Sequence, residues 1–133
     1  MAKVKYIRCD IYKRGIYIFI GSPQELIAWS EKTFKSEDYK EFNEGLKECS
    51  YGEADFHYTN EDGCGLVRIP KFPKTPAEIA YTTHELLHAT MWLLWYCGVE
   101  YDPEGANEAY TYLLEHLVRN TFEKEGYEIV EKD

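Results

Sequence analysis

Two histidines and a glutamate stand out in this sequence as residues whose types and spacing suit metal chemistry. His84, Glu85 and His88 form an HExxH pattern inside Thr75 to Cys97, a stretch that reads as one uninterrupted helix. Residues four apart lie on the same face of a helix, one turn above each other, so the two imidazoles could bind one metal ion. A catalytic zinc has three protein ligands and one open position. The pattern therefore predicts a zinc site whose third ligand comes from elsewhere in the chain.

We expect that third ligand at Glu108. A second helix beginning after Pro103 would carry this carboxylate back across the first helix. Glu104 is the alternative, but it lies at the start of the helix, where acidic residues often serve only the helix dipole. Glu85 would lie beside the metal without binding it, in the place of a general base.

The segments His84–Ala89 and Asn107–Ala109 resemble the gluzincins, the thermolysin-like class of zinc metallopeptidases. His88 and Glu108 are twenty positions apart, which is also the separation in that class. The resemblance covers about Ala54 to Val118, and the short chain is similar in size to the minigluzincins. The class has an aspartate one turn after its ligand glutamate, where this chain has Tyr112.

The resemblance implies hydrolysis of peptide bonds in a peptide or protein substrate. Zn²⁺ held by His84, His88 and Glu108 would lower the pKa of its bound water, and Glu85 would take the proton as that water attacks a carbonyl. Zincins also use a donor to the transition state. His57, His116 and several tyrosines are candidates, of which His57 is the best placed. Its strand occupies the place of the edge strand with which a substrate peptide pairs in this class.

Four strands in two hairpins are expected to support the motif helix. Val4–Tyr12 and Gly15–Ile20 are rich in Ile, Tyr and Val, and Ala54–Thr59 and Gly65–Pro70 flank a turn-rich segment. We therefore predict an α+β, zincin-like fold in one domain, residues 1–133. In it a small mixed or antiparallel sheet of about four strands packs on the HExxH helix, and a C-terminal helix bears the glutamate.

Capping boxes mark the start of two helices. Ser22-Pro23-Gln24-Glu25 and Thr75-Pro76-Ala77-Glu78 each combine a hydroxyl cap, a proline at the first helical position and a glutamate three residues after the cap. The expected helices are Pro23 to about Phe34, Asp38–Glu48, Thr75–Cys97 with Gly98 as its end, and about Glu104 to Lys124. The tail Phe122–Asp133 is expected to add a strand or to cross the cleft as a self-inhibiting segment.

Charge and hydropathy exclude two classes of partner. The 24 acidic residues outnumber the 15 lysines and arginines, and the net charge of −9 argues against nucleic-acid binding, which depends on cations that neutralise phosphates. The chain has no run of eighteen apolar residues, so we expect no membrane span. The four cysteines form no CxxC pair, and the N-terminal residues lack an apolar signal core, which predicts reduced thiols in a cytoplasmic protein. Two disulfides in a secreted domain are the alternative.

A different function class stays open beside the peptidase. A histidine pair on a helix can also be a surface pair, and a catalytically silent zincin-like protein could bind a metal or a partner, for example in a phage or mobile element. In a third interpretation, the segment Glu104–Asn107 resembles part of the repressor-cleaving HExxH proteases of mobile elements. Substitution of Glu85 distinguishes an enzyme from a scaffold, because only the enzyme needs that carboxylate. The oligomeric state is not predicted.

Overall fold

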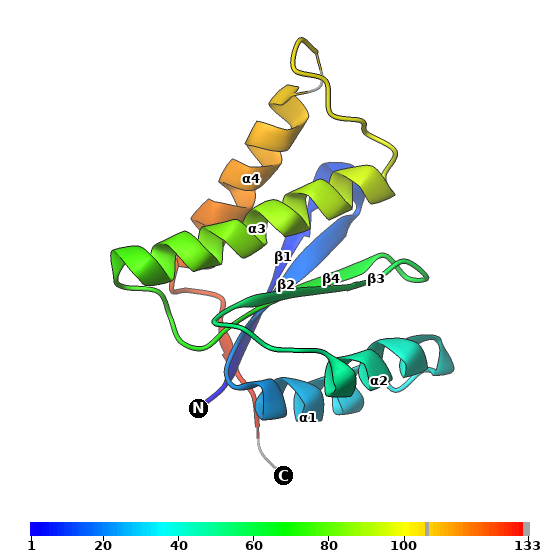
Figure 1. The fold of residues 1–133 in the computed structure, drawn as a ribbon, viewed down its shortest axis with the longest axis vertical. Helices are drawn as coiled ribbons and strands as arrows, with labels where there is room; N and C mark the ends of the chain where they lie inside the picture. Colours follow the sequence, from blue (N-terminus) through cyan, green and yellow to red (C-terminus); the bar gives the residue numbers. More distant parts are fainter. Residues whose placement is uncertain (106, 132–133) are drawn as a thin grey trace.

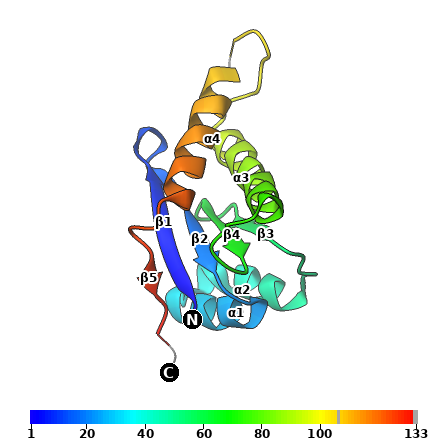
Figure 2. The same ribbon diagram turned by 90° about the vertical axis from the view of Figure 1, so that its left-hand side faces the viewer.

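A five-stranded mixed sheet separates two pairs of helices (Figure 1). The computed structural model describes residues 1–105 and 107–131. Within these ranges the strands follow the spatial order β3-β4-β2-β1-β5. Helices α1 and α2 cover one face of the sheet, and α3 and α4 cover the other (Figures 1 and 2). The α+β class is confirmed, with five strands in place of about four.

Both predicted hairpins are present. The strands are β1 (Lys3–Cys9), β2 (Arg14–Ile20), β3 (Asp55–Thr59), β4 (Cys64–Ile69) and β5 (Glu128–Ile129). Strands β1 and β2 pair antiparallel, as do β3 and β4, whereas β2 and β4 are parallel neighbours and make the sheet mixed. The C-terminal segment adds β5 to β1, at the edge of the sheet opposite to β3, and so does not cross the α3 side of β3.

The described residues form four α-helices, two of which begin where the capping boxes predict. They are α1 (Pro23–Thr33), α2 (Lys40–Glu48), α3 (Pro76–Tyr96) and α4 (Asn107–Phe122), with short 3₁₀ turns at Asp10–Tyr12 and Glu37–Tyr39. The side chains of Ser22 and Thr75 accept the hydrogen bonds that start α1 and α3. Helix α3 ends before Gly98, whose φ of 80° is the left-handed conformation that glycine adopts without strain. Part of the segment predicted to begin α4 lies at position 106, outside the described residues.

The side chains of β2 point alternately to the two faces of the sheet, and the core accordingly has two layers. Ile16 and Ile18 face α3 and α4, whereas Phe19 faces α1 and α2. On the α3 side these strand residues pack against Leu86 and Leu93, which are fully buried. Burial of one such side chain contributes roughly 1.5–3 kcal/mol, so this contact fixes the rotation of α3 about its own axis.

The four cysteines are all free thiols, with no disulfide among them. Cys9 and Cys64 are buried, Cys49 is half-buried and Cys97 is exposed at the end of α3. In the part of the chain that the structure describes, no helix is both long and apolar enough to cross a membrane.

Candidate metal centre

Helix α3 carries the HExxH pattern in its third and fourth turns, and its buried side determines where the pattern points. Leu86, Ala89 and Leu93 lie at 0% exposure against the sheet. Because successive residues on a helix are about 100° apart, His84 and His88 then lie on the opposite, solvent-facing side. Both histidines are exposed in the structure. The motif is therefore held on a rigid helix, with both histidines exposed to solvent.

The two imidazole rings converge. His84 Nε2 and His88 Nε2 are 3.2 Å apart, and the ring planes are inclined by 75°. Two nitrogens bound to one tetrahedral zinc at about 2.0–2.1 Å each would lie about 3.3 Å apart. The distance between these nitrogens therefore fits two ligands of one metal ion, and it also permits a hydrogen bond from one ring to the other in a suitable tautomer.

Glu85 lies beside this pair, with most of its side chain out of solvent. The side chain is 14% exposed, and Oε1 is 4.0 Å from His84 Nε2. Burial raises the pKa of Glu85 above that of an ordinary carboxyl group, against the opposing effect of the two histidines, and the charge of Asp55 adds to the increase. A carboxyl group with a raised pKa next to metal-ligating nitrogens is suited to accept and return a proton.

The direction of Glu85 can be followed from Trp92. The two residues are seven apart, about two turns, so they share one side of α3. The ring of Trp92 contacts Phe56 and Tyr58 of β3, with centroids 6.0 and 5.6 Å apart. Glu85 therefore faces β3, which is an edge strand of the sheet. On its outer side β3 pairs with no other strand among the residues that the structure describes.

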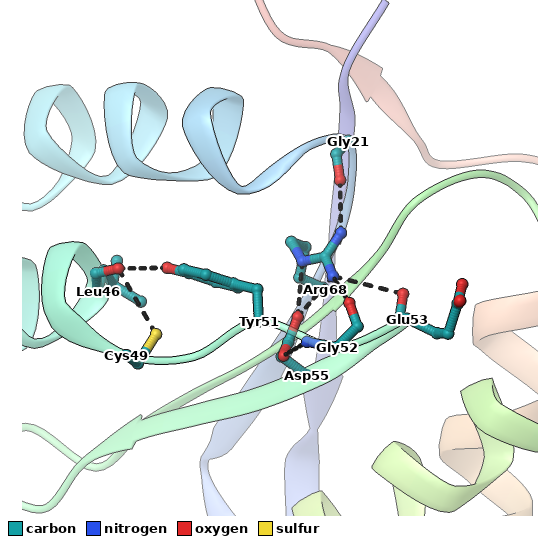
Figure 3. Close-up of polar contacts among 8 residues, drawn as sticks. All are labelled: Gly21, Leu46, Cys49, Tyr51, Gly52, Glu53, Asp55 and Arg68. Atoms are coloured by element: carbon teal, nitrogen blue, oxygen red, sulfur yellow. Dashed lines mark hydrogen bonds and ion pairs between the residues drawn. The ribbon is translucent and has the colours of Figure 1, made fainter.

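A buried arginine fixes the start of this edge strand (Figure 3). Arg68 is 2% exposed and lies in β4, where its Nε and Nη2 atoms donate to Asp55 Oδ2 at 2.8 and 2.6 Å. The same guanidinium donates to the carbonyl oxygens of Gly21 and Gly52 at 3.0 and 2.8 Å. The other Asp55 oxygen accepts from the Gly52 amide. These bonds tie the loop before β3 to the centre of the sheet.

Sequence reasoning missed Arg68, although a signal was present. It is the one charged residue in a strand that is otherwise apolar and buried on both faces. A charge in such a position requires a partner, because an unpaired buried charge costs several kcal/mol. The strand could therefore have been searched for an acidic partner in the neighbouring hairpin strand, where Asp55 lies directly opposite.

His57 does not face the histidines of α3. Phe56 and Tyr58 point toward Trp92, so the strand alternation turns His57 to the other face of the sheet. There its ring lies 5.6 Å from that of Tyr51, beside α2. On β3, the side chains of Phe56 and Tyr58 lie on the α3 side, and that of His57 lies on the opposite side. The position of His57 therefore does not support its proposed role as transition-state donor.

Glu108 lies in the first turn of α4 and is exposed. Leu113, Leu117 and Thr121 are the buried residues of this helix. Glu108 precedes Leu113 by five positions, about 140° around the helix. The N-terminal end of α4 also points away from the sheet (Figures 1 and 2). Within residues 1–105 and 107–131, no group of three or more His, Cys, Asp or Glu side chains is arranged to hold a metal ion. The structure brings His84, Glu85 and His88 together and leaves Glu108 apart from them.

Comparison of the chain with known protein families, with characterised proteins and with solved structures found no match in any of the three.

Proposed function

We propose that the chain is a zinc-dependent metallopeptidase whose metal is held by His84 and His88. The observation that carries this proposal is the convergence of the two Nε2 atoms to 3.2 Å beside a largely buried glutamate. Imidazole nitrogens at this separation are suitable zinc ligands, and the exposed position of both rings leaves room for water and substrate.

Each part of the site has a chemical role in this proposal. Bound zinc would supply a nucleophile from water at neutral pH and would polarise the scissile carbonyl. Glu85 accepts the proton from the attacking water and returns it to the leaving amine. Its raised pKa suits both steps, because a carboxyl group with a pKa nearer neutrality is a stronger base and can also hold the proton.

The edge strand β3 supports binding of an extended peptide. Its outer backbone groups pair with no other strand in the described chain, and Glu85 faces this strand from α3. A peptide added as a further strand would gain backbone hydrogen bonds without any particular sequence, and side-chain contacts would provide selectivity. The Arg68–Asp55 pair keeps β3 in register with β4 for this purpose.

Glu108 remains the predicted third ligand, on the basis of the sequence resemblance. Because this carboxylate stands apart from the histidines here, its binding to the same metal requires α4 or the segment between α3 and α4 to move toward α3. A site with only the two histidines would leave the zinc with fewer protein ligands than catalytic zinc sites have.

Metal analysis of the purified chain tests the site. We expect about one zinc per chain by elemental mass spectrometry, and its loss in the double variant His84→Ala/His88→Ala. His116→Ala is the matched control, since this exposed histidine instead contacts the Arg8 carbonyl oxygen at 2.9 Å. Equal zinc in the double variant would refute the metal site.

Hydrolysis is tested separately, with unfolded casein as a general substrate. Glu85→Gln should keep the zinc and the fold but lose cleavage, because glutamine cannot accept the proton. Glu48→Gln, on the exposed side of α2, is the control and should cleave like the wild type. Cleavage that survives Glu85→Gln would contradict the proposed mechanism.

A partner-binding scaffold is the second candidate, and one observation favours it. Leu87, Met91 and Trp95 follow each other at helical spacing on the outer side of α3 and are 44, 52 and 64% exposed. Exposed apolar side chains in a row are typical of surfaces that contact another protein. Under this alternative, Glu85→Gln would leave the biological function intact, whereas substitution of Met91 and Trp95 by Ser would impair it.

A further inference from the structure

A hollow rimmed by lysines lies at the end of the sheet near the start of α3. Its volume is about 420 Å³, within the range of small-molecule pockets. The residues that argue for a function are four lysines and two aromatic residues of its lining: Lys3, Lys71, Lys74, Lys124, Phe72 and Tyr127. Neither His84 nor His88 contributes to it, so the hollow is separate from the candidate metal centre.

The charge of this hollow is opposite to that of the whole chain. Four of the 15 basic residues line it, and no acidic residue does, although the chain has a net charge of −9. Lys71 is paired with Glu78 at 2.7 Å. Lys3, Lys74 and Lys124 form no ion pair with a carboxylate of the described residues. Three ammonium groups are thus available to a ligand at one place.

Two aromatic rings form fixed walls beside these charges. The rings of Phe72 and Tyr127 meet edge to face, with centroids 6.3 Å apart. Tyr127 is held by a hydrogen bond from its hydroxyl group to the Thr121 carbonyl oxygen at 2.7 Å, and Lys5 Nζ lies 4.4 Å from its ring centroid. Lys124 Nζ lies 5.6 Å from the centroid of Phe72. Walls that are held in place before a ligand arrives reduce the entropic cost of binding.

We propose that this hollow binds a small phosphate monoester that carries an aromatic ring. A dianionic phosphate matches several lysines around one space, since lysine binds phosphate as a point charge with three donors. The ring would lie against Phe72 and Tyr127. Nucleic acid is a poorer fit because the cationic residues are gathered at one small hollow and the rest of the chain is acidic.

Two ligands share this chemistry, and calorimetry distinguishes them. AMP represents a nucleotide, and O-phosphotyrosine represents a phosphorylated tyrosine. We expect the full chain to bind at least one of them, with an affinity that falls as salt increases. Adenosine and N-acetyltyrosinamide, which have the ring without the phosphate, should bind at least about tenfold more weakly than their phosphate counterparts. Inorganic phosphate should also bind more weakly, because it lacks the ring. Tighter binding of AMP assigns the hollow to nucleotides, and tighter binding of phosphotyrosine assigns it to phosphorylated tyrosine.

Variants connect the binding to the hollow. Lys3→Ala/Lys124→Ala should weaken binding by at least about tenfold, since each change removes a charge that the phosphate would contact. Lys35→Ala, an exposed lysine outside the hollow, should bind like the wild type. The same melting temperature in all three proteins shows that the fold is kept. Absence of binding to both phosphates, or binding that is unchanged in the double variant, would overturn the proposal.

Discussion

Arg68 Nη2 and Asp55 Oδ2 lie 2.6 Å apart, in a pair whose side chains are only 3 and 10% exposed. The pair joins two neighbouring strands and, through Gly21 and Gly52, also joins the ends of two loops to the sheet. Together with the backbone pairing of β3 and β4, it therefore holds the edge strand β3 in position.

Removal of one partner of this pair should destabilise the chain strongly. Asp55→Ala would leave the Arg68 guanidinium buried without its counter-ion, at an expected cost of about 3–5 kcal/mol in the free energy of unfolding. Urea unfolding measures this loss. Glu115→Ala is the control, because its pair with Arg119 is 59 and 74% exposed and should be worth about 0.5 kcal/mol or less. Similar losses in the two variants would show that Arg68 finds another partner.

His57 should make stability depend on pH below neutrality. Burial lowers the pKa of His57 from its ordinary value of 6.5, so the unfolded chain takes up a proton more readily than the folded one. Its contribution is therefore complete above pH 6.5 and is lost as the pH falls below that value. Urea unfolding at pH 7.5 and at pH 5.5 measures this contribution. The free energy of unfolding should fall more between these two pH values in the wild type than in His57→Gln. An equal fall in both proteins would mean that His57 has the same protonation state in the folded and the unfolded chain. His116→Gln serves as the exposed control.

The start of α3 should be sensitive to acid. Glu78 has a pKa lowered to about 2, first by its hydrogen bond with Lys71 and then by the backbone amides of Thr75 and Lys74. The stabilisation from the ionised carboxylate is thus present above the ordinary value of 4.5 and is lost as the pH falls toward about 2. Glu78→Gln should remove this acid-dependent part. Thr75→Ala, which removes only the hydroxyl cap, should cost about 1 kcal/mol at every pH.

Glu108→Gln tests whether Glu108 is a zinc ligand. The sequence resemblance predicts that it is, whereas the structure leaves this carboxylate apart from His84 and His88. If Glu108 completes the site, the variant should bind zinc at least about tenfold more weakly than the wild type, because one anionic ligand is lost. Competition with a chelating dye measures this affinity. Glu104→Gln, the rival ligand of the sequence, is the matched control. An unchanged affinity in Glu108→Gln would limit the metal to the two histidines and would count against hydrolysis while leaving metal binding intact.

Local patterns predicted the elements that support the motif. The two capping boxes mark the starts of α1 and α3, and Gly98 ends α3, because each signal acts through bonds within a few residues. The hairpins followed from composition and turn residues in the same way. Such signals determine where elements begin and end, but they do not determine which elements become neighbours.

The parts of the candidate site that depend on tertiary contacts were harder to predict. The face of His57 depends on the contacts of its two neighbours, Phe56 and Tyr58, with Trp92, which lies 36 and 34 residues further along the chain. The side of α4 on which Glu108 lies depends on where the helix begins relative to Leu113, its first buried residue. Both orientations could have been derived from strand alternation and helix periodicity once the buried sides were assigned, because a position opposite to a buried residue faces away from the core.

The thiol of Cys97 is exposed just beyond the end of α3. Among the four cysteines it alone is exposed, whereas burial raises the pKa of Cys9 to about 11 and that of Cys64 to about 12. Alkylation at neutral pH should therefore occur first at Cys97, since the thiolate is the reactive form. Cys97 precedes the segment that leads from α3 to α4. A fluorophore attached there would report, without any engineered residue, whether that segment rearranges when zinc is added.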